Sequence, residues 1–259
     1  MDGARCKLWQ YNSLHRSIVL GLGNTVSDSA RSWTPSDLPG LKLWYKFNQG
    51  LENNAGAFPG NGEEIEVWRD QSGNANDATA TTDDVTYNGT EKCPFFLTVQ
   101  SKFEFQKLVL GECSIFLRLK FQTGQNIDSG DIFADSATTN DFIKIQNNSS
   151  GSEEVRWKVN GSNKKFAPTE AFVVNEKYNL CFNRSAGGVL SAFMTSRANS
   201  TALNPMEKVS AADSAITNTF TTNTLFGGND MFFYEMLVFT ENLHSTDRNK
   251  LNEYLNSEN

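Results

Sequence analysis

Apolar and polar residues alternate in short segments along most of the chain. The clearest segment is 113–122, where every second residue from Ile115 to Phe121 is large and apolar. A period of two places these side chains on one face of a β-strand, because successive side chains point to opposite sides of a sheet. The same pattern, or an enrichment in β-branched and aromatic residues, predicts the other strands. They are residues 41–47, 64–69, 94–100, 102–106, 141–146, 153–159, 178–183, 189–196, 224–227 and 232–239.

Turn-forming residues separate the predicted strands. Asn-Gly pairs begin at Asn61 and Asn160, and Gly-Gly pairs begin at Gly187 and Gly227. Such pairs adopt the backbone angles that tight turns between antiparallel strands require. Short strands that recur at intervals of roughly ten residues are typical of a β-sandwich.

One segment has helical rather than strand periodicity. Residues 245–255 begin with Ser, Thr and Asp, which cap helix N-termini, and Leu251, Tyr254 and Leu255 fall on one helix face. The sequence therefore predicts an all-β protein, a sandwich of two antiparallel sheets with a short C-terminal helix.

Residues 1–33 differ from the rest of the chain. Isolated apolar residues are mixed with Gly, Ser and Asn, and neither helical nor strand periodicity persists. The sequence thus predicts an extended N-terminal arm at 1–33 and a sandwich at 34–259. The arm carries many large apolar groups, so it either docks on a partner chain or packs on its own domain as a strand and loop. The candidate anchors are Trp9, Tyr11, Leu14, Ile18, Leu20, Leu22 and Trp33.

Composition and charge argue against several classes of protein. Apolar residues make up 38% of the 259 residues, which excludes an intrinsically disordered chain. The chain carries 30 acidic and 23 basic residues, and no run of clustered Lys or Arg, which argues against nucleic-acid binding. No apolar run approaches the ~18 residues of a membrane span, and the short run at 17–23 lacks the features of a signal peptide. We therefore expect no membrane association.

The cysteines and histidines favour neither a zinc site nor a disulfide framework. The four cysteines are far apart and form no C-x-x-C pair, and only His15 and His244 could add imidazole ligands. Neither histidine lies near a nucleophile motif. We expect reduced, mostly buried thiols at Cys6, Cys93, Cys113 and Cys181.

Three segments, in order along the chain, resemble one known superfamily. Residues 36–45 read SDLPGLKLWY, residues 67–78 read VWRDQSGNANDA, and residues 227–229 precede a predicted strand and the terminal helix. These segments are similar to the laminin G-like jelly-roll domains of the concanavalin A-like lectin/glucanase superfamily. The resemblance covers residues 34–259 and implies a jelly roll of two antiparallel sheets.

The second of these segments allows two interpretations. Gly73 permits a positive φ, and Asp70 and Asp77 can accept backbone N–H groups, as in a structural turn. Alternatively, the oxygen atoms of Asp70, Asn74, Asn76 and Asp77 could bind calcium. The sequence indicates no other cofactor or metal.

The carboxylates do not match the catalytic pattern of the glucanases in this superfamily. That pattern is Glu-x-Asp followed, after one or two residues, by a second Glu, and it places a nucleophile and a general acid on one strand face. Glu64 and Glu66 share a face of a predicted strand but lack the central Asp and the third carboxylate, and Glu153 and Glu154 are adjacent. We expect no enzymatic activity.

The resemblance implies a structural role. Similar laminin G-like domains occur in virions of tailed phages. We therefore expect a virion protein whose arm docks on major capsid or tail subunits and whose jelly roll is exposed, as a capsid decoration or a fibre or tail accessory. Such a domain could contact host cell-surface glycans and could form oligomers. The alternative is a lectin-type carbohydrate-binding module not tied to a virion. Its candidate sugar contacts are Trp157, Phe58, Tyr87 and Asn61. Trp157 lies in a predicted strand, so packing in the core or on a sheet face is an equal alternative for it.

Overall fold

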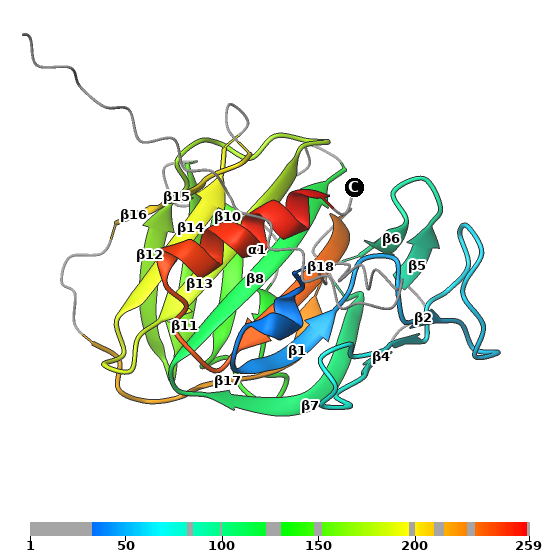
Figure 1. Ribbon diagram of the computed structural model, residues 1–259, viewed down its shortest axis with the longest axis horizontal. Helices are drawn as coiled ribbons and strands as arrows, with labels where there is room; N and C mark the ends of the chain where they lie inside the picture. The colour runs from blue at the N-terminus through cyan, green and yellow to red at the C-terminus, as the bar shows by residue number, and fades with distance from the viewer. Residues whose placement is uncertain are drawn as a thin grey trace, which may run out of the picture. The chain divides into compact units, whose positions relative to one another are not determined.

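Two antiparallel β-sheets and one α-helix make up most of the part of the chain that the structure describes (Figure 1). The computed structural model describes residues 33–81, 85–98, 100–122, 131–147, 152–196, 200–209, 215–226 and 231–257. The sandwich belongs to a compact unit of Thr34–Asn259. The six predicted arm anchors from Trp9 to Leu22 lie outside the described residues, whereas Trp33 is described and is partly buried.

The first sheet contains eight strands in the order β15-β14-β13-β8-β18-β6-β5, with β1 beside β18. The start of β18 pairs with β6 and its C-terminal half pairs with β1. The strands are β1 (Leu41–Tyr45), β5 (Val85–Asn88), β6 (Cys93–Phe96), β8 (Cys113–Phe121), β13 (Lys177–Arg184), β14 (Leu190–Thr195), β15 (Leu203–Pro205) and β18 (Met231–Phe239). A short 3-10 turn, η1 (Pro35–Asp37), precedes β1.

The second sheet contains ten strands in the order β16-β12-β11-β10-β9-β17-β7-β4-β3-β2. The strands are β2 (Leu51–Glu52), β3 (Val67–Trp68), β4 (Ala78–Ala80), β7 (Lys102–Leu110), β9 (Asp131–Ala134), β10 (Phe142–Asn147), β11 (Glu153–Val159), β12 (Ser162–Ala167), β16 (Glu207–Lys208) and β17 (Phe220–Phe226).

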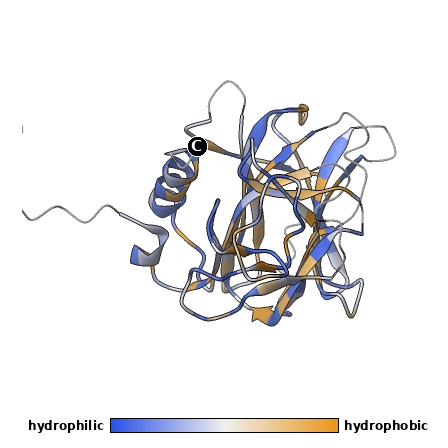
Figure 2. Ribbon diagram, turned by 90° about the vertical axis from the view of Figure 1, so that its right-hand side faces the viewer, coloured by the Kyte–Doolittle hydropathy of each residue, from blue (hydrophilic) through white to orange (hydrophobic). Residues whose placement is uncertain are grey.

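The helix α1 (Ser245–Ser257) lies against the outer face of the first sheet (Figure 1). It buries Leu251 and Leu255, and Asn252 accepts a hydrogen bond from Asn179 of β13 (2.7 Å). Its remaining surface is mostly hydrophilic, as the colours of Figure 2 show. Within the described ranges, no helix is long and apolar enough to cross a membrane.

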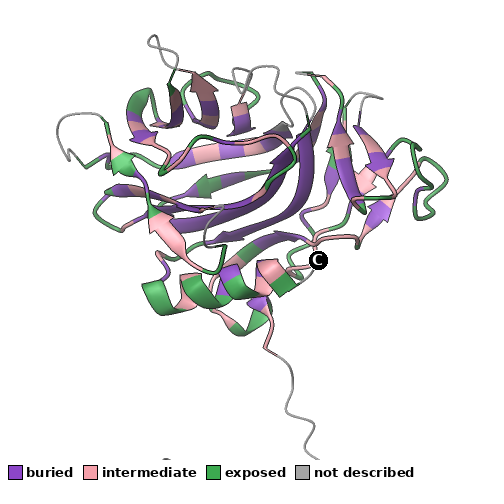
Figure 3. Cartoon of the chain, turned by 90° about the horizontal axis from the view of Figure 1, so that it is seen from above, coloured by how far each residue is buried: buried purple, intermediate pink, exposed green. Residues whose placement is uncertain are grey.

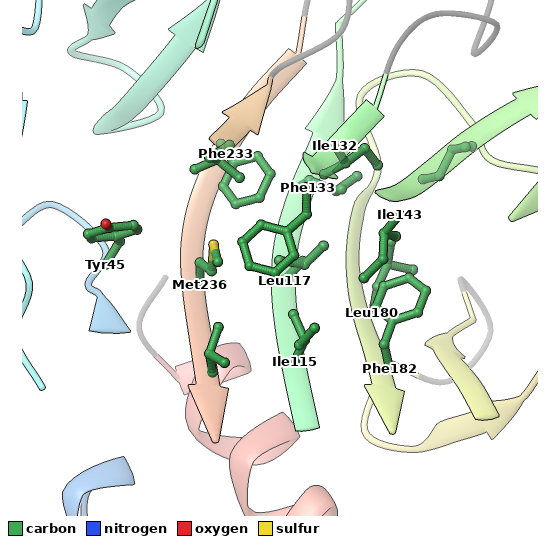
Figure 4. Close-up of a cluster of buried hydrophobic side chains, with 14 of the residues drawn as sticks. Tyr45, Ile115, Leu117, Ile132, Phe133, Ile143, Leu180, Phe182, Phe233 and Met236 are labelled. Carbon is green, nitrogen blue, oxygen red and sulfur yellow. The ribbon is translucent and has the colours of Figure 1, made fainter. Parts of the chain in front are cut away.

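The apolar core lies between the two sheets (Figures 3 and 4). Ile115 and Leu117 of β8 lie opposite Phe133 of β9 and Ile143 of β10, and all four side chains are fully buried. Alternate residues of β8 point into this core, as the period of two predicts. The intervening residues of β8 are buried as well, because α1 and neighbouring turns cover the outer face of the first sheet.

The predicted fold class is confirmed, and each predicted strand overlaps an observed one. The predicted strand at 64–69 is wrong in extent, because only Val67 and Trp68 are in a strand. Ile65 donates its backbone N–H to the carbonyl of Val85 in β5, whereas Val67 pairs with Glu52 of β2. These partners belong to different sheets, so residues 64–69 do not form one continuous strand. The pattern missed seven of the observed strands, which are β2, β4, β5, β9, β12, β15 and β16.

Candidate functional site

Phe58 is the most exposed aromatic side chain among the residues that the structure describes, with 50% of its surface in solvent. It lies in the loop of residues 53–64, within the connection 53–66 that joins β2 to β3. Pro59, which follows it, is buried. An aromatic ring left in solvent on a folded loop is a candidate contact surface, since most aromatic side chains are buried in the core.

Hydrogen bonds within the loop fix the backbone around Phe58. Asn53 Oδ1 accepts two backbone amides of the loop (3.0 Å each), and Asn53 Nδ2 donates to Glu63 Oε1 (2.7 Å). Glu63 Oε2 accepts the amide of Gly60 (2.7 Å). The bond from Gly60, and next the bond from Asn53, lower the pKa of the Glu63 carboxyl. The loop therefore holds Phe58 in a defined position without burying it.

Tyr87 of β5 supports the exposed ring. The two rings meet edge to face, with centroids 5.1 Å apart and an interplanar angle of 78° between Phe58 and Tyr87. The Tyr87 hydroxyl donates to Asn48 Oδ1 (2.9 Å), and burial raises the pKa of this hydroxyl, so it stays protonated. Asn61 Oδ1 accepts the amide of Gly89 (2.7 Å). We call Phe58, Tyr87, Asn48 and Asn61 the aromatic corner.

Backbone pairing between the loop and β5 brings the corner together. Gly62 donates to the carbonyl of Tyr87 (2.7 Å), and Tyr87 donates to the carbonyl of Glu63 (2.8 Å). The loop thus adds short, strand-like contacts to β5, which is an edge strand of the first sheet. In Figure 1 this region lies beside β2, β5 and β6, at the end of the sandwich far from β12 and β16.

Three of the four predicted sugar contacts, Phe58, Tyr87 and Asn61, therefore lie together. The fourth, Trp157, does not belong to the site, because its side chain is fully buried. Its ring packs edge to face against Phe182 and Phe220, each 5.8 Å away between centroids. Of the two interpretations of Trp157, core packing is confirmed and the sugar contact is wrong, because the period of two in β11 directs this residue into the core.

A charged cluster missed by sequence analysis lies on the turn that follows β5. Glu91 Oε1 accepts a hydrogen bond from Lys120 Nζ (2.6 Å), and Glu91 Oε2 accepts one from the Tyr234 hydroxyl. Lys177 Nζ lies 3.8 Å from Glu91 Oε2. We call these four residues the Glu91 cluster. Lys120 is 29 residues and Tyr234 is 143 residues from Glu91, so no local motif could indicate the cluster.

Protonation in the Glu91 cluster favours a closed ion-pair network. Desolvation raises the pKa of the Glu91 carboxyl, but the hydrogen bonds from Lys120 and Tyr234 outweigh it and lower the pKa overall. Desolvation raises the pKa of Tyr234, and it lowers that of Lys177. At neutral pH the carboxylate is charged and the phenol is protonated. The hydrogen bond between the Glu91 carboxylate and the Tyr234 phenol fixes the turn after β5. Neither group is an activated nucleophile.

The residues of the predicted turn or calcium site lie together and use their oxygen atoms within the chain. Asp70 Oδ1 accepts the amides of Trp44 and Ser72 (2.9 Å each), and Asp70 Oδ2 accepts the Ser72 hydroxyl (2.7 Å) and the amide of Asn76 (3.1 Å). Asp77 accepts the amide of Asp70 (2.9 Å) through Oδ1.

The remaining groups of this turn tie it to neighbouring strands. Asn74 Nδ2 donates to the carbonyls of Leu41 and Lys42 (3.1 Å each). Asn76 exchanges two hydrogen bonds with the backbone of Gln106 (3.2 and 2.7 Å). Asp70, Asn74 and Asn76 thus bond this turn to the backbone of β1 or β7, whereas Asp77 bonds within the turn. Over the described ranges, no group of three or more His, Cys, Asp or Glu could hold a metal ion.

The carboxylate pairs considered as catalytic candidates do not converge. Glu153 and Glu154 are successive residues of β11 and point to opposite faces. Glu153 accepts the amide of Phe172 (2.6 Å), and burial raises its pKa. Glu64 and Glu66 are both exposed and lie outside the strands, so the strand face that they were predicted to share is absent.

The cysteines agree with the prediction where the structure describes them. Cys93, Cys113 and Cys181 are free and buried, and Cys6 lies outside the described residues. Burial raises the pKa of each thiol, that of Cys113 to about 12. Thiols of this kind are unreactive at neutral pH.

Comparison with protein-family models and with curated proteins finds no match. Comparison with solved structures finds many similar folds. One is domain 4 of AbnA, a GH43 extracellular arabinanase from Geobacillus stearothermophilus, solved in complex with arabinotriose. The TM-score is 0.54 at 13% identity, over 82% of this chain and 98% of that domain.

Two further structures share the fold. Trypanosoma rangeli sialidase matches with a TM-score of 0.53 at 10% identity, over 82% of this chain and 32% of that one. The botulinum neurotoxin serotype D binding domain matches with a TM-score of 0.52 at 14% identity, over 83% of this chain and 51% of that one. The chain thus spans nearly all of the arabinanase domain, about half of the neurotoxin fragment and about a third of the sialidase. At these identities the likeness shows the fold alone, a β-sandwich.

Proposed function

We propose that the chain is a non-enzymatic glycan-binding β-sandwich and that the aromatic corner contacts the sugar. The observation that carries the proposal is the half-exposed ring of Phe58, which Tyr87 supports from the edge. The C–H face of a sugar ring can pack against such a ring, while neighbouring amides serve its hydroxyls. Asn54 and Asn61 are exposed in the same loop and offer such amides.

Two further observations support this proposal. The loop is held by its own hydrogen bonds, so little conformational entropy is lost when a ligand binds. The arabinanase domain that shares this fold over nearly its whole length was solved in complex with a trisaccharide of arabinose.

The test compares Phe58→Ala with Val109→Ala. Val109 is 63% exposed on β7 and serves as a matched control. After a glycan array selects a ligand, titration calorimetry should show at least tenfold weaker binding for Phe58→Ala and unchanged binding for Val109→Ala. Both variants should unfold within about 0.5 kcal/mol of the parent, because both sites are exposed. Equal binding by both variants, or no binding to any glycan, would contradict the proposal.

We also propose a setting for this binding domain, as a virion structural protein of a tailed phage. Residues 1–33 would attach it to capsid or tail subunits through Trp9, Tyr11, Leu14, Ile18, Leu20, Leu22 and Trp33. The sandwich would then be displayed on the virion and could reach cell-surface glycans. The resemblance of residues 36–45 and 67–78 to phage laminin G-like domains supports this role.

Deletion of residues 1–32 tests the attachment. The truncated chain should keep its melting temperature and its glycan binding but should no longer copurify with phage particles. Loss of folding on deletion would mean that these residues belong to the sandwich, and retention on particles would exclude attachment through them.

A further inference from the structure

Three basic residues form a straight row across the outer face of the second sheet. Lys144 of β10 lies directly opposite Arg156 of β11, and Arg156 lies directly opposite Lys165 of β12. Their neighbours along each strand, such as Ile143 and Val155, point into the core, so the row faces outward. The side chains of Arg156 and Lys165 are 25% and 39% exposed. We call Lys144, Arg156 and Lys165 the basic row.

Like charges that face each other across strands destabilise a sheet, so such a row needs a compensating feature. The carboxylate of Glu154 compensates part of this positive charge, and only 3% of its side chain is exposed. Its Oε2 lies 3.2 Å from Lys165 Nζ, and its Oε1 lies 3.7 Å from Arg156 Nε. Gln146 Nε2 donates to the same Oε1 (2.7 Å), which holds the carboxylate in place.

The other charges nearby leave an excess of positive charge. Asp131 of β9 lies opposite Lys144 in the strand register, and desolvation raises the pKa of its carboxyl. Lys158 adds a fourth cation; it donates to the carbonyl of Thr139 (2.8 Å) and lies over the ring of Phe142. Glu207 of β16, exposed and opposite Ala167 of β12, adds a third carboxylate. Among the described residues the face therefore carries four cations against three carboxylates, in a chain whose net charge is −7.

Packing also fixes the geometry of the face. The guanidinium of Arg156 lies 6.0 Å from the ring centre of Phe142, and the ammonium of Lys158 lies 5.4 Å from it. Charges held in this way lose little freedom when a ligand of opposite charge binds. A positive face on an acidic protein is thus preorganised for an anion.

We propose that the basic row binds an acidic polysaccharide with a carboxylate on each sugar, lying across β10, β11 and β12. Adjacent strands are ~4.8 Å apart, so the row offers one cation at about each sugar length along the polymer. Nucleic acid fits less well. Along the axis of a duplex, each strand carries one phosphate every ~3.4 Å. Phe142, the aromatic ring at this face, is only 9% exposed and offers no platform for base stacking.

This site is separate from the aromatic corner, which is built on β5 and the loop of residues 53–64. Its test does not depend on the proposed function of that corner. Phe58→Ala should leave binding at the basic row unchanged, so failure of one proposal is distinguishable from failure of the other.

The experiment measures binding of the full-length chain to polygalacturonate, with dextran as the neutral polymer. The test variant is Lys144→Gln with Lys165→Gln. The control is Lys42→Gln with Lys250→Gln, which removes two exposed lysines elsewhere. A third variant, Lys144→Arg with Lys165→Arg, keeps the charge and guards against effects on folding.

We expect the parent to bind polygalacturonate, more weakly as salt rises, and not to bind dextran. The test variant should bind at least tenfold more weakly, and the control and the arginine variant within twofold of the parent. No binding by the parent, or equal binding by the test variant, would overturn the proposal. Competition by single-stranded DNA as strong as that by polygalacturonate would overturn the assignment to a polysaccharide.

Discussion

The carboxylate of Asp70 accepts a hydrogen bond from the backbone amide of Trp44 (2.9 Å), 26 residues earlier in the chain. This bond joins the segments 36–45 and 67–78. Tyr45, next to Trp44, stacks on Trp68 with ring centroids 5.4 Å apart, and its hydroxyl donates to the carbonyl of Asn76 (2.8 Å). The two motifs are therefore one structural unit, in which a turn replaces strand pairing at the edge of β1.

Asp70→Asn should destabilise the sandwich by about 2–4 kcal/mol, because an amide supplies one acceptor oxygen where the carboxylate serves four donors. The measurement is urea unfolding. Glu253→Gln, at an exposed position of α1, is the control and should change stability by less than about 0.5 kcal/mol. A loss for Asp70→Asn no larger than that of the control would show that the turn does not stabilise the fold.

Calcium should not change the melting temperature of the protein. Both oxygens of Asp70 and both of Asp77 accept hydrogen bonds from the chain, and an ion would have to displace those donors. Melting curves with EDTA and with millimolar calcium should therefore coincide. A rise in melting temperature with calcium concentration that Asp77→Asn abolishes would instead establish a calcium site at this turn.

Sequence alone could predict those elements in which the hydrophobic pattern repeats over a long segment. The strand at 113–122 and the helix at 245–255 each repeat their pattern enough times to be recognised. Strands such as β2 and β16 have two residues each, too few for any period. The strand β12 reads SNKKFA, and its inward positions include Lys164, so hydrophobic patterning does not mark it.

The candidate sites show a similar limit. Exposure of Phe58 depends on a loop that pairs with β5, and no local pattern states that Phe58 and Tyr87 are in contact. The basic row consists of lysines and one arginine spaced 12 and 9 residues apart, so it forms no run in the sequence and becomes a row only through strand register. The absence of a basic run therefore did not indicate an absence of a basic face.

Arg184→Lys should cost about 2–4 kcal/mol of stability. The buried guanidinium of Arg184 donates to the carbonyls of Gly111, Ile216 (2.6 Å) and Asn218, and an ammonium cannot span all three. Arg69→Lys is the matched control. Arg69 is 45% exposed and pairs with Glu52 and Asp77 at the surface, so Arg69→Lys should cost much less stability than Arg184→Lys. Equal losses in urea unfolding for the two variants would contradict the buried role of Arg184.

The Glu91 cluster should make stability depend on pH in the acidic range. Lys120 and Tyr234 hold the folded-state pKa of Glu91 below its ordinary value of 4.5. A carboxyl with a lowered folded-state pKa contributes stability that is fully present above the unfolded-state pKa. That contribution is lost as the pH falls through the folded-state pKa.

Glu91→Gln tests this dependence. At pH 7 the variant should be less stable than the parent by about 1–3 kcal/mol, because Lys120, with 9% of its side chain exposed, loses its counter-ion. As the pH falls below 4.5, the parent should lose this advantage and the two unfolding free energies should converge. Glu112→Gln, at an exposed position between β7 and β8, should differ little from the parent at any pH. The unfolding free energies of Glu91→Gln and the parent could instead differ by the same amount from pH 7 to pH 3. That result would show that the carboxylate does not act through its charge.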